Sequence, residues 1–173
     1  DQDDVILVTQ NGQSIRFAVS GLRASSRTSG GVRAIRLAPG DHVVSMDKAE
    51  AEAFLLVVTT GGFGKRTPIS QYPPQQRAGS GVRTFKFAEK TGKVAAAKVV
   101  SPLEEVFITS AAGIIERIEV EEKDPRKGIT TQSRSTQGVS LMKPAPGDEV
   151  VAIASFERLK DKGLVKTKKK RTK

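Results

Sequence analysis

The chain has 173 residues, no cysteine and a formal net charge of +10. The absence of cysteine excludes disulfides, thiolate metal sites and a cysteine nucleophile. The sequence shows no signal peptide and no apolar run long enough to cross a bilayer, so we expect a soluble, intracellular protein without a membrane partner.

The positive charge is unevenly distributed. The tail from Lys160 to Lys173 holds eight Lys or Arg against one acid, a net +7, which leaves +3 of the total +10 for residues 1–159. Residues 5–40 and 53–88 each contain five Lys or Arg and no acid, whereas the acids between Glu116 and Asp124 largely offset the bases around them. Two segments of the body therefore favour a polyanionic partner, and the third favours it less.

One pattern recurs about every fifty residues, a period in the range of propeller-like arrays. Each copy has an apolar run, a turn glycine, an arginine four residues later, and a second block in which Arg and three residues precede Gly-Val. The turn glycines are Gly12, Gly62 and Gly113, the arginines are Arg16, Arg66 and Arg117, and the blocks are 27–32, 77–82 and 134–139. The pattern predicts three units, residues 1–53, 54–104 and 105–159, followed by a basic, disordered tail over residues 160–173.

Each unit is predicted to contain four short strands. The first two form a hairpin, because Asn11-Gly12 and Gly61-Gly62 tolerate the positive φ angles of a tight turn, and Ala112-Gly113 offers a weaker version. Later strands over 32–37 and 82–87 alternate apolar and basic residues, which predicts one buried and one cationic face.

Helix signals are poor throughout the chain, because β-branched residues fill the apolar runs and Gly or Pro interrupts the longer windows. Only residues 47–54 suggest a turn or two of helix, and a link between two units is the preferred interpretation. One four-stranded unit with few aromatic residues buries little core alone, so neighbouring units must cover its faces. The sequence thus predicts an all-β, propeller-like array of about three four-stranded antiparallel blades.

The most specific stretch is Leu56–Tyr72, with the sequence LVVTTGGFGKRTPISQY. Together with Gly81–Lys86 and Thr136–Leu141 it resembles the C-terminal domain of the DNA gyrase A protein, over about 150 residues. The resemblance implies a β-pinwheel, in which neighbouring blades exchange strands and duplex DNA bends around a positively charged rim. Duplex DNA is then the expected partner, in the cytoplasm and associated with the nucleoid.

Two departures limit what the resemblance implies. A gyrase domain of this kind usually has six blades, so three blades correspond to the C-terminal half. The family's Gln-Arg-Arg-Gly-Gly-Arg-Gly box is absent in full form, and its nearest counterpart is Gln75–Gly81. The box is expected upstream of Asp1. The similar protein of topoisomerase IV remains an alternative, although the intact Lys65-Arg66-Thr67-Pro68 segment favours gyrase.

Cations repeated at equivalent places along a rim suit phosphate contacts, which position DNA without reading its sequence. The alternative for the arginines four residues past the turn glycine is that they brace the blade; this is preferred for Arg117, whereas DNA contact is preferred for Lys65 and Arg66. The predicted DNA-binding residues are Arg16, Arg27, Arg33, Lys65, Arg66, Arg77, Arg83 and Lys86. Phe63 is given no role.

No catalytic or metal site is expected in this chain. His42 follows a turn with no nucleophile or ligand cluster in the sequence beside it, and the segment 61–64 lacks the rest of a nucleotide-binding motif. The resemblance implies that Tyr72 is not the catalytic tyrosine, which lies upstream. It also implies an ATP-hydrolysing type II topoisomerase as parent, with ATP and magnesium bound elsewhere, and two partners, the gyrase A breakage-reunion domain and the gyrase B protein. A protein-interaction propeller that does not bind DNA is the alternative.

Overall fold

The computed structural model describes residues 3–121 and 128–157. They form short strands linked by turns and three single-turn 3-10 helices. The strands are β1 (Asp4–Thr9), β2 (Gln13–Ala18), β3 (Val43–Lys48), β4 (Phe54–Thr59), β5 (Phe63–Pro68), β6 (Val82–Arg83), β7 (Val94–Val100), β8 (Glu104–Ser110), β9 (Ile115–Glu119), β10 (Val139–Ser140) and β11 (Val150–Glu157). The 3-10 helices are η1 (Val19–Gly21), η2 (Ile69–Gln71) and η3 (Glu89–Thr91). No helix in the described residues is long and apolar enough to span a bilayer.

The three predicted hairpins are confirmed. Strands β1 and β2, β4 and β5, and β8 and β9 pair antiparallel across turns that contain Gly12, Gly62 and Gly113. Gly62 has a φ of 77°, and a Cβ on it would lie on top of the Met142 carbonyl oxygen of the third unit. Glycine is therefore required there by the turn and by the close approach of the next unit.

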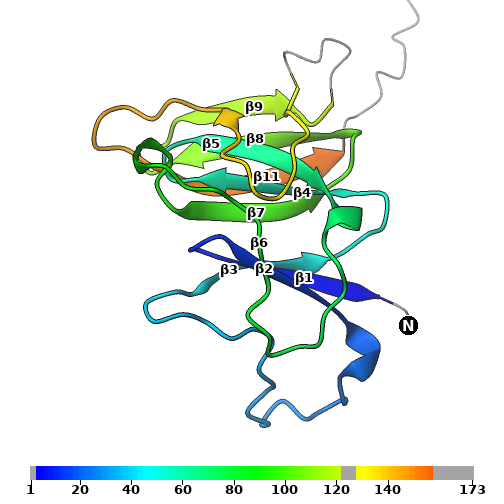
Figure 1. Ribbon diagram of the computed structural model, residues 1–173. Helices are drawn as coiled ribbons and strands as arrows, with labels where there is room; N and C mark the ends of the chain where they lie inside the picture. Colours follow the sequence, from blue (N-terminus) through cyan, green and yellow to red (C-terminus); the bar gives the residue numbers. More distant parts are fainter. Residues whose placement is uncertain (1–2, 122–127, 158–173) are drawn as a thin grey trace, which may run out of the picture.

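The strands form three antiparallel sheets, and neighbouring units exchange strands as the resemblance implies. The first sheet has the order β3-β1-β2-β6, the second β10-β5-β4-β7, and the third β11-β8-β9. Strand β6 belongs to the second sequence unit but completes the first sheet, and β10 of the third unit completes the second sheet. In Figure 1 the first sheet lies below the other two, with β6 running down beside β2. The all-β pinwheel fold is confirmed.

Two apolar cores lie between the sheets. Because side chains alternate along a strand, Leu55 and Val57 of β4 face the first sheet while Leu56 and Val58 face the third. All four are at most 1% exposed, which explains why the central strand of the middle sheet is a continuous apolar run. At the opposite edge from β6 and β10, strand β7 contacts both β3 and β11, and the three strands form the inner edge of the array.

Some sequence-based expectations are corrected. Residues 32–37 are not a strand, and in the segment 82–87 only Val82 and Arg83 pair, because the exchanged strand is two residues long. Residues 47–54 contain no helix and link the first two units, as the preferred interpretation had it: Asp47 and Lys48 belong to β3, and a turn over 51–52 leads into β4. The predicted tail lies outside the described residues.

Candidate nucleic-acid interface

The second blocks of the repeat form three loops of similar shape. Each loop has a turn that begins at its arginine, Arg27, Arg77 or Arg134. Each then passes through a glycine of positive φ (Gly31 at 71°, Gly81 at 73° and Gly138 at 72°). The second and third loops lead into β6 and β10, the exchanged strands on the outside of the sheets. The loops and the exchanged strands form the outer rim of the array.

Each junction between units brings basic residues of two units together. At the first junction, the Ala78 N–H donates to the Ala34 carbonyl at 2.7 Å and the Arg36 N–H donates to the Gly79 carbonyl at 2.8 Å. The Arg77 guanidinium also reaches the Arg33 carbonyl at 3.4 Å. We call Arg33, Arg36 and Arg77 the first rim cluster; all three are exposed.

The second junction repeats this arrangement one unit later. The Lys86 N–H donates to the Thr136 carbonyl at 3.0 Å, and the Arg134 guanidinium reaches the Arg83 carbonyl at 3.5 Å. We call Arg83, Lys86 and Arg134 the second rim cluster. Arg83 and Lys86 are exposed and Arg134 is half-buried.

The charges of both rim clusters are available to a ligand. No carboxylate within residues 3–121 and 128–157 forms an ion pair with any of these six side chains. Arg77 and Arg134 each donate one guanidinium N–H to a protein carbonyl, which leaves their other donors for a ligand, and five of the six residues are exposed. Unpaired cations on loops fixed by backbone hydrogen bonds are the chemistry that contacts phosphates.

Arg16, predicted to contact DNA, lies inside the array. Its Nε donates to Asp4 Oδ2 at 2.7 Å, and Nη1 lies 3.3 Å from the carbonyl oxygens of both Ile69 and Tyr72. Its side chain is 17% exposed. Arg16 therefore braces the second unit against the first sheet, the alternative the sequence left open, and we exclude it from the interface.

Lys65 is also buried, which corrects its interpretation as a phosphate contact. Its side chain is 0% exposed, and its ammonium donates to the Ser133 carbonyl at 2.5 Å, the Arg134 carbonyl at 2.6 Å and Thr136 Oγ1 at 3.0 Å. Burial, followed by the positive charge of Arg134, lowers the pKa of Lys65 to about 8.

Arg66 lies beneath the third unit and is 8% exposed. Its guanidinium lies 4.7 Å from the centre of the Phe54 ring and 3.8 Å from a Glu121 carboxylate oxygen. Burial lowers the pKa of Arg66, and the Glu121 carboxylate raises it. The side chain faces the protein, so the prediction that it contacts DNA is also corrected.

Of the other residues considered from the sequence, Arg27 and Arg117 are exposed and Tyr72 is buried. Arg27 lies exposed on the first loop, at the outer end of the first unit. Arg117, expected to brace its blade, forms a two-bond ion pair with Glu105 at 2.9 and 2.7 Å across the third sheet. Glu105 raises the pKa of Arg117. Tyr72 is 1% exposed, and its hydroxyl lies 2.6 Å from Thr84 Oγ1, so it belongs to the core and offers no ring surface to a base.

Sequence reasoning missed two rim residues, Arg36 and Arg134. Arg36 lies fifty residues before Lys86, which was predicted, so the repeat itself carried the signal. Arg134 was left out because the third unit is rich in acids. Strand exchange separates Arg134 from those acids, because β10 carries its loop to the second sheet while Glu116 and Glu119 lie on β9 of the third.

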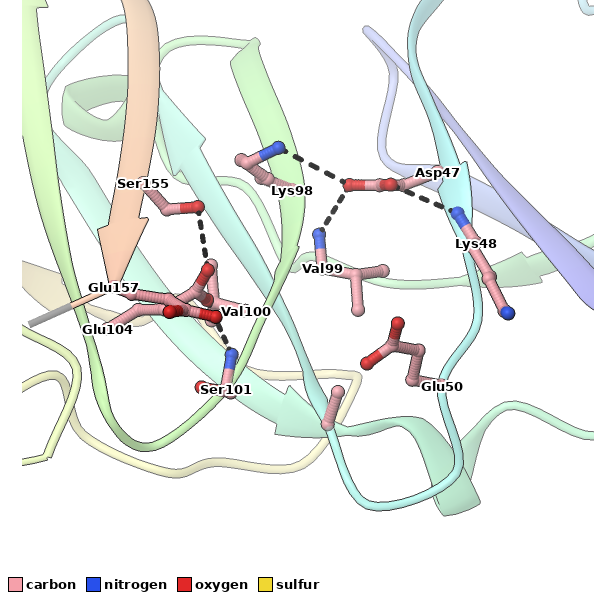
Figure 2. A pocket seen from close by; sticks show the side chains of 11 residues that line it. Asp47, Lys48, Glu50, Lys98, Val99, Val100, Ser101, Glu104, Ser155 and Glu157 are labelled. Atoms are coloured by element: carbon pink, nitrogen blue, oxygen red, sulfur yellow. Dashed lines mark hydrogen bonds and ion pairs between the residues drawn. The ribbon is translucent and has the colours of Figure 1, made fainter.

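A polar pocket at the inner edge contrasts with the rim (Figure 2). There Asp47 accepts the Val99 N–H at 3.1 Å and lies 3.8 Å from Lys98, while Glu104 accepts the Ser101 N–H at 2.6 Å. The named donors and acceptors of the pocket are therefore paired with one another. Within the described residues no group of three or more acids or histidines is arranged to hold a metal ion.

The family model described as "DNA gyrase C-terminal domain, beta-propeller" matches residues 3–50, 53–101 and 127–157. The chain belongs to the DNA gyrase C-terminal domain family. Among its relatives, the DNA gyrase A protein of Dehalogenimonas lykanthroporepellens is 51% identical over 154 residues, which are 89% of this chain and 19% of the relative. The DNA gyrase A protein of Staphylococcus epidermidis is 36% identical over 161 residues, 92% of this chain and 17% of the relative. The chain thus spans about a fifth of these gyrase A proteins.

Solved structures of the same fold include C-terminal domains of both enzymes considered from the sequence. The C-terminal domain of DNA topoisomerase IV matches with a TM-score of 0.81 at 21% identity, over 90% of this chain and 47% of that one. The DNA gyrase A C-terminal domain matches with a TM-score of 0.78 at 23% identity, over 90% and 51%. This array corresponds to about half of such a domain.

Proposed function

We propose that this gyrase C-terminal domain binds duplex DNA along its outer rim and bends it. The observation that carries the proposal is the repetition of the rim cluster at two successive junctions. Both junctions share one equivalent backbone hydrogen bond and one guanidinium-to-carbonyl contact, and neither cluster has a carboxylate partner among the described residues. A single exposed basic cluster is weak support. Two at equivalent places in consecutive units support a track for a repeating polyanion.

The shape of the array supports bending rather than straight binding. Strand β7 contacts both β3 and β11 at the inner edge, so the rim clusters lie on the outside of the arc. Phosphate contacts along a convex edge hold a duplex only if it follows the curve, and the added contacts offset the cost of deforming it. Such contacts depend steeply on salt and little on sequence.

The wider role concerns the whole gyrase A protein, of which this chain covers about a fifth. We propose that the rim guides DNA for a type II topoisomerase that uses ATP and magnesium outside this chain to introduce negative supercoils. The proposed partners are the gyrase A breakage-reunion domain and the gyrase B protein. The chain itself is proposed to supply DNA geometry and no catalytic group.

The test is a topological measurement. A nicked circular plasmid is saturated with a chain that lacks residues 158–173, the nick is sealed, and the linking number is compared with that of a protein-free control. A protein-dependent change that disappears when Arg77, Arg83 and Lys86 are replaced by glutamine is expected. Binding without any linking-number change would contradict chiral bending by this array, and absence of binding would contradict the interface.

A further inference from the structure

The position three residues after each turn glycine has a different side chain in each unit. It is Ile15 in the first, Lys65 in the second and Glu116 in the third. Ile15 and Lys65 are both 0% exposed, whereas Glu116 is exposed on β9. In the first two sheets, this side chain lies beneath the loop that the following unit places on the rim.

The two buried side chains meet these loops in different ways. Ile15 packs in an apolar cluster with Leu7, Phe17 and Ile35, and its Cδ1 lies near Gly79 of the second loop, 3.7 Å from where a Cβ on that glycine would stand. Lys65 makes three short hydrogen bonds to the third loop, to the carbonyls of Ser133 and Arg134 and the hydroxyl of Thr136. Its ammonium also lies 5.4 Å from the centre of the Phe85 ring. An ammonium has three N–H donors, and all three have an oxygen partner here.

The residues that Lys65 binds lie in the loop that carries Arg134 of the second rim cluster. The Arg134 guanidinium reaches outward to the Arg83 carbonyl, and the Thr136 carbonyl accepts the Lys86 N–H. Lys65 therefore holds the Ser133 and Arg134 carbonyls and the Thr136 hydroxyl from inside, while Arg83 and Lys86 of the same second unit bind Arg134 and Thr136 from outside. Loss of the Lys65 hydrogen bonds would free the loop and with it the Arg134 side chain.

We infer that Lys65 is a positioning residue for the second rim cluster, and that its buried ammonium links DNA binding at that cluster to proton uptake. The inference rests on the proposed DNA-binding function. Lys65 then acts on DNA binding through the loop and does not contact DNA itself.

The electrostatic surroundings of Lys65 give the direction of this linkage. Val57 of β4 lies opposite it, the Phe85 ring covers it, and Arg134 is the charged group that acts on it from the loop. Burial first, and Arg134 second, lower its pKa to about 8 in the free protein. A phosphate at the cluster would oppose both effects, because an anion stabilises the protonated amine. DNA binding should therefore take up a proton, and affinity should fall as pH rises above 8.

The experiment uses the full chain with Lys65→Ile, the residue at the equivalent place in the first unit, and Lys65→Met as a second variant. Lys86→Met is the matched control, because Lys86 is exposed at the same cluster. Amide hydrogen exchange of residues 132–136 is measured without DNA, and affinity for a short duplex is measured from pH 7 to 9.5. For the unaltered chain, the NMR titration of the Lys65 side chain is recorded with and without duplex.

For the Lys65 variants we expect about tenfold faster exchange in the loop, a several-fold loss of affinity, and loss of the affinity decrease above pH 8. Lys86→Met should lose affinity without a change in loop exchange or in the pH profile. The Lys65 side-chain titration should move to higher pH when DNA is bound.

Unchanged loop exchange in both Lys65 variants would overturn the positioning role. An unmoved Lys65 titration on saturation with DNA would overturn the proton linkage, and this measurement needs no variant to fold. A failure of the proposed DNA-binding function would give a different result. Replacing Arg83 and Arg134 by glutamine would then leave duplex affinity unchanged, while the Lys65 variants would still show faster amide exchange in the loop.

Discussion

The interior of the array and its outer rim use the same residue types for opposite purposes. Inside, Arg16, Lys65 and Arg66 are largely buried, and protein oxygens or an aromatic ring hold each of them. On the rim, Arg33, Arg77 and Arg83 are exposed, with no carboxylate partner in the described residues. The comparison teaches that basic charge counted along this sequence divides into cations that hold neighbouring units together and cations that remain available to a polyanion.

The largest expected effect comes from breaking an interior cation. Arg16→Ala leaves Asp4 without its partner and two carbonyls of the second unit without a donor. We expect a loss of about 2–3 kcal/mol in the free energy of unfolding, measured by urea denaturation, because these groups are mostly shielded from water. DNA affinity under native conditions should stay near that of the unaltered chain. A tenfold affinity loss with unchanged stability would place Arg16 on the interface instead.

The second effect concerns pH. The folded-state pKa of Lys65, about 8, lies below the ordinary value of 10.5. The unfolded state therefore holds more protons between these values, and stability rises with pH across that window. Between pH 7.5 and 9.5 the gain should be about 1–2 kcal/mol relative to Lys65→Met, measured by denaturant unfolding of both proteins. Parallel pH profiles of the two proteins would contradict the lowered pKa of Lys65.

The third effect sharpens the rim side of the comparison. Arg83→Gln with Lys86→Gln removes two exposed cations, and we expect about a tenfold loss of duplex affinity at moderate salt without loss of stability. The matched control is Lys48→Gln with Lys98→Gln, which removes the same charge from the inner edge, where both lysines lie near aspartates. Anisotropy titrations compare the two double variants. Equal losses would mean that net charge alone governs binding.

The smallest effect is expected at the exposed ion pair of the third sheet. Arg117→Gln removes the partner of Glu105, but the arginine side chain is 63% exposed, so water screens the pair. Melting temperature and DNA affinity should both remain within experimental error. A clear loss of affinity would extend the interface onto β9.

Much of the fold follows from local sequence. The turn glycines and the apolar runs before them predicted all three hairpins, because their backbone and burial requirements are local. The strand exchange came from the family resemblance alone, since nothing in residues 80–83 indicates that Val82 pairs with Ser14 of another unit. Pairing partners far apart in sequence depend on how units stack, which local patterns do not encode.

The candidate site was predictable only in part. Arg33, Arg77, Arg83 and Lys86 were identified from periodic basic residues in acid-free segments, and the structure leaves them exposed. Lys65 and Arg66 carry the same signal but lie on β5, where the third unit covers them. Sequence spacing shows that a cation recurs, whereas its accessibility depends on the neighbouring unit that packs over it.

The most direct test of the rim is the salt dependence of duplex binding by a chain that ends at Glu157, compared with the same chain carrying glutamine at all six rim-cluster residues. If these six cations contact phosphates, the slope of log affinity against log salt should be about −5 and should fall close to zero in the variant. An unchanged slope in a folded variant would contradict binding at the rim, because the phosphate contacts would then lie elsewhere on the molecule.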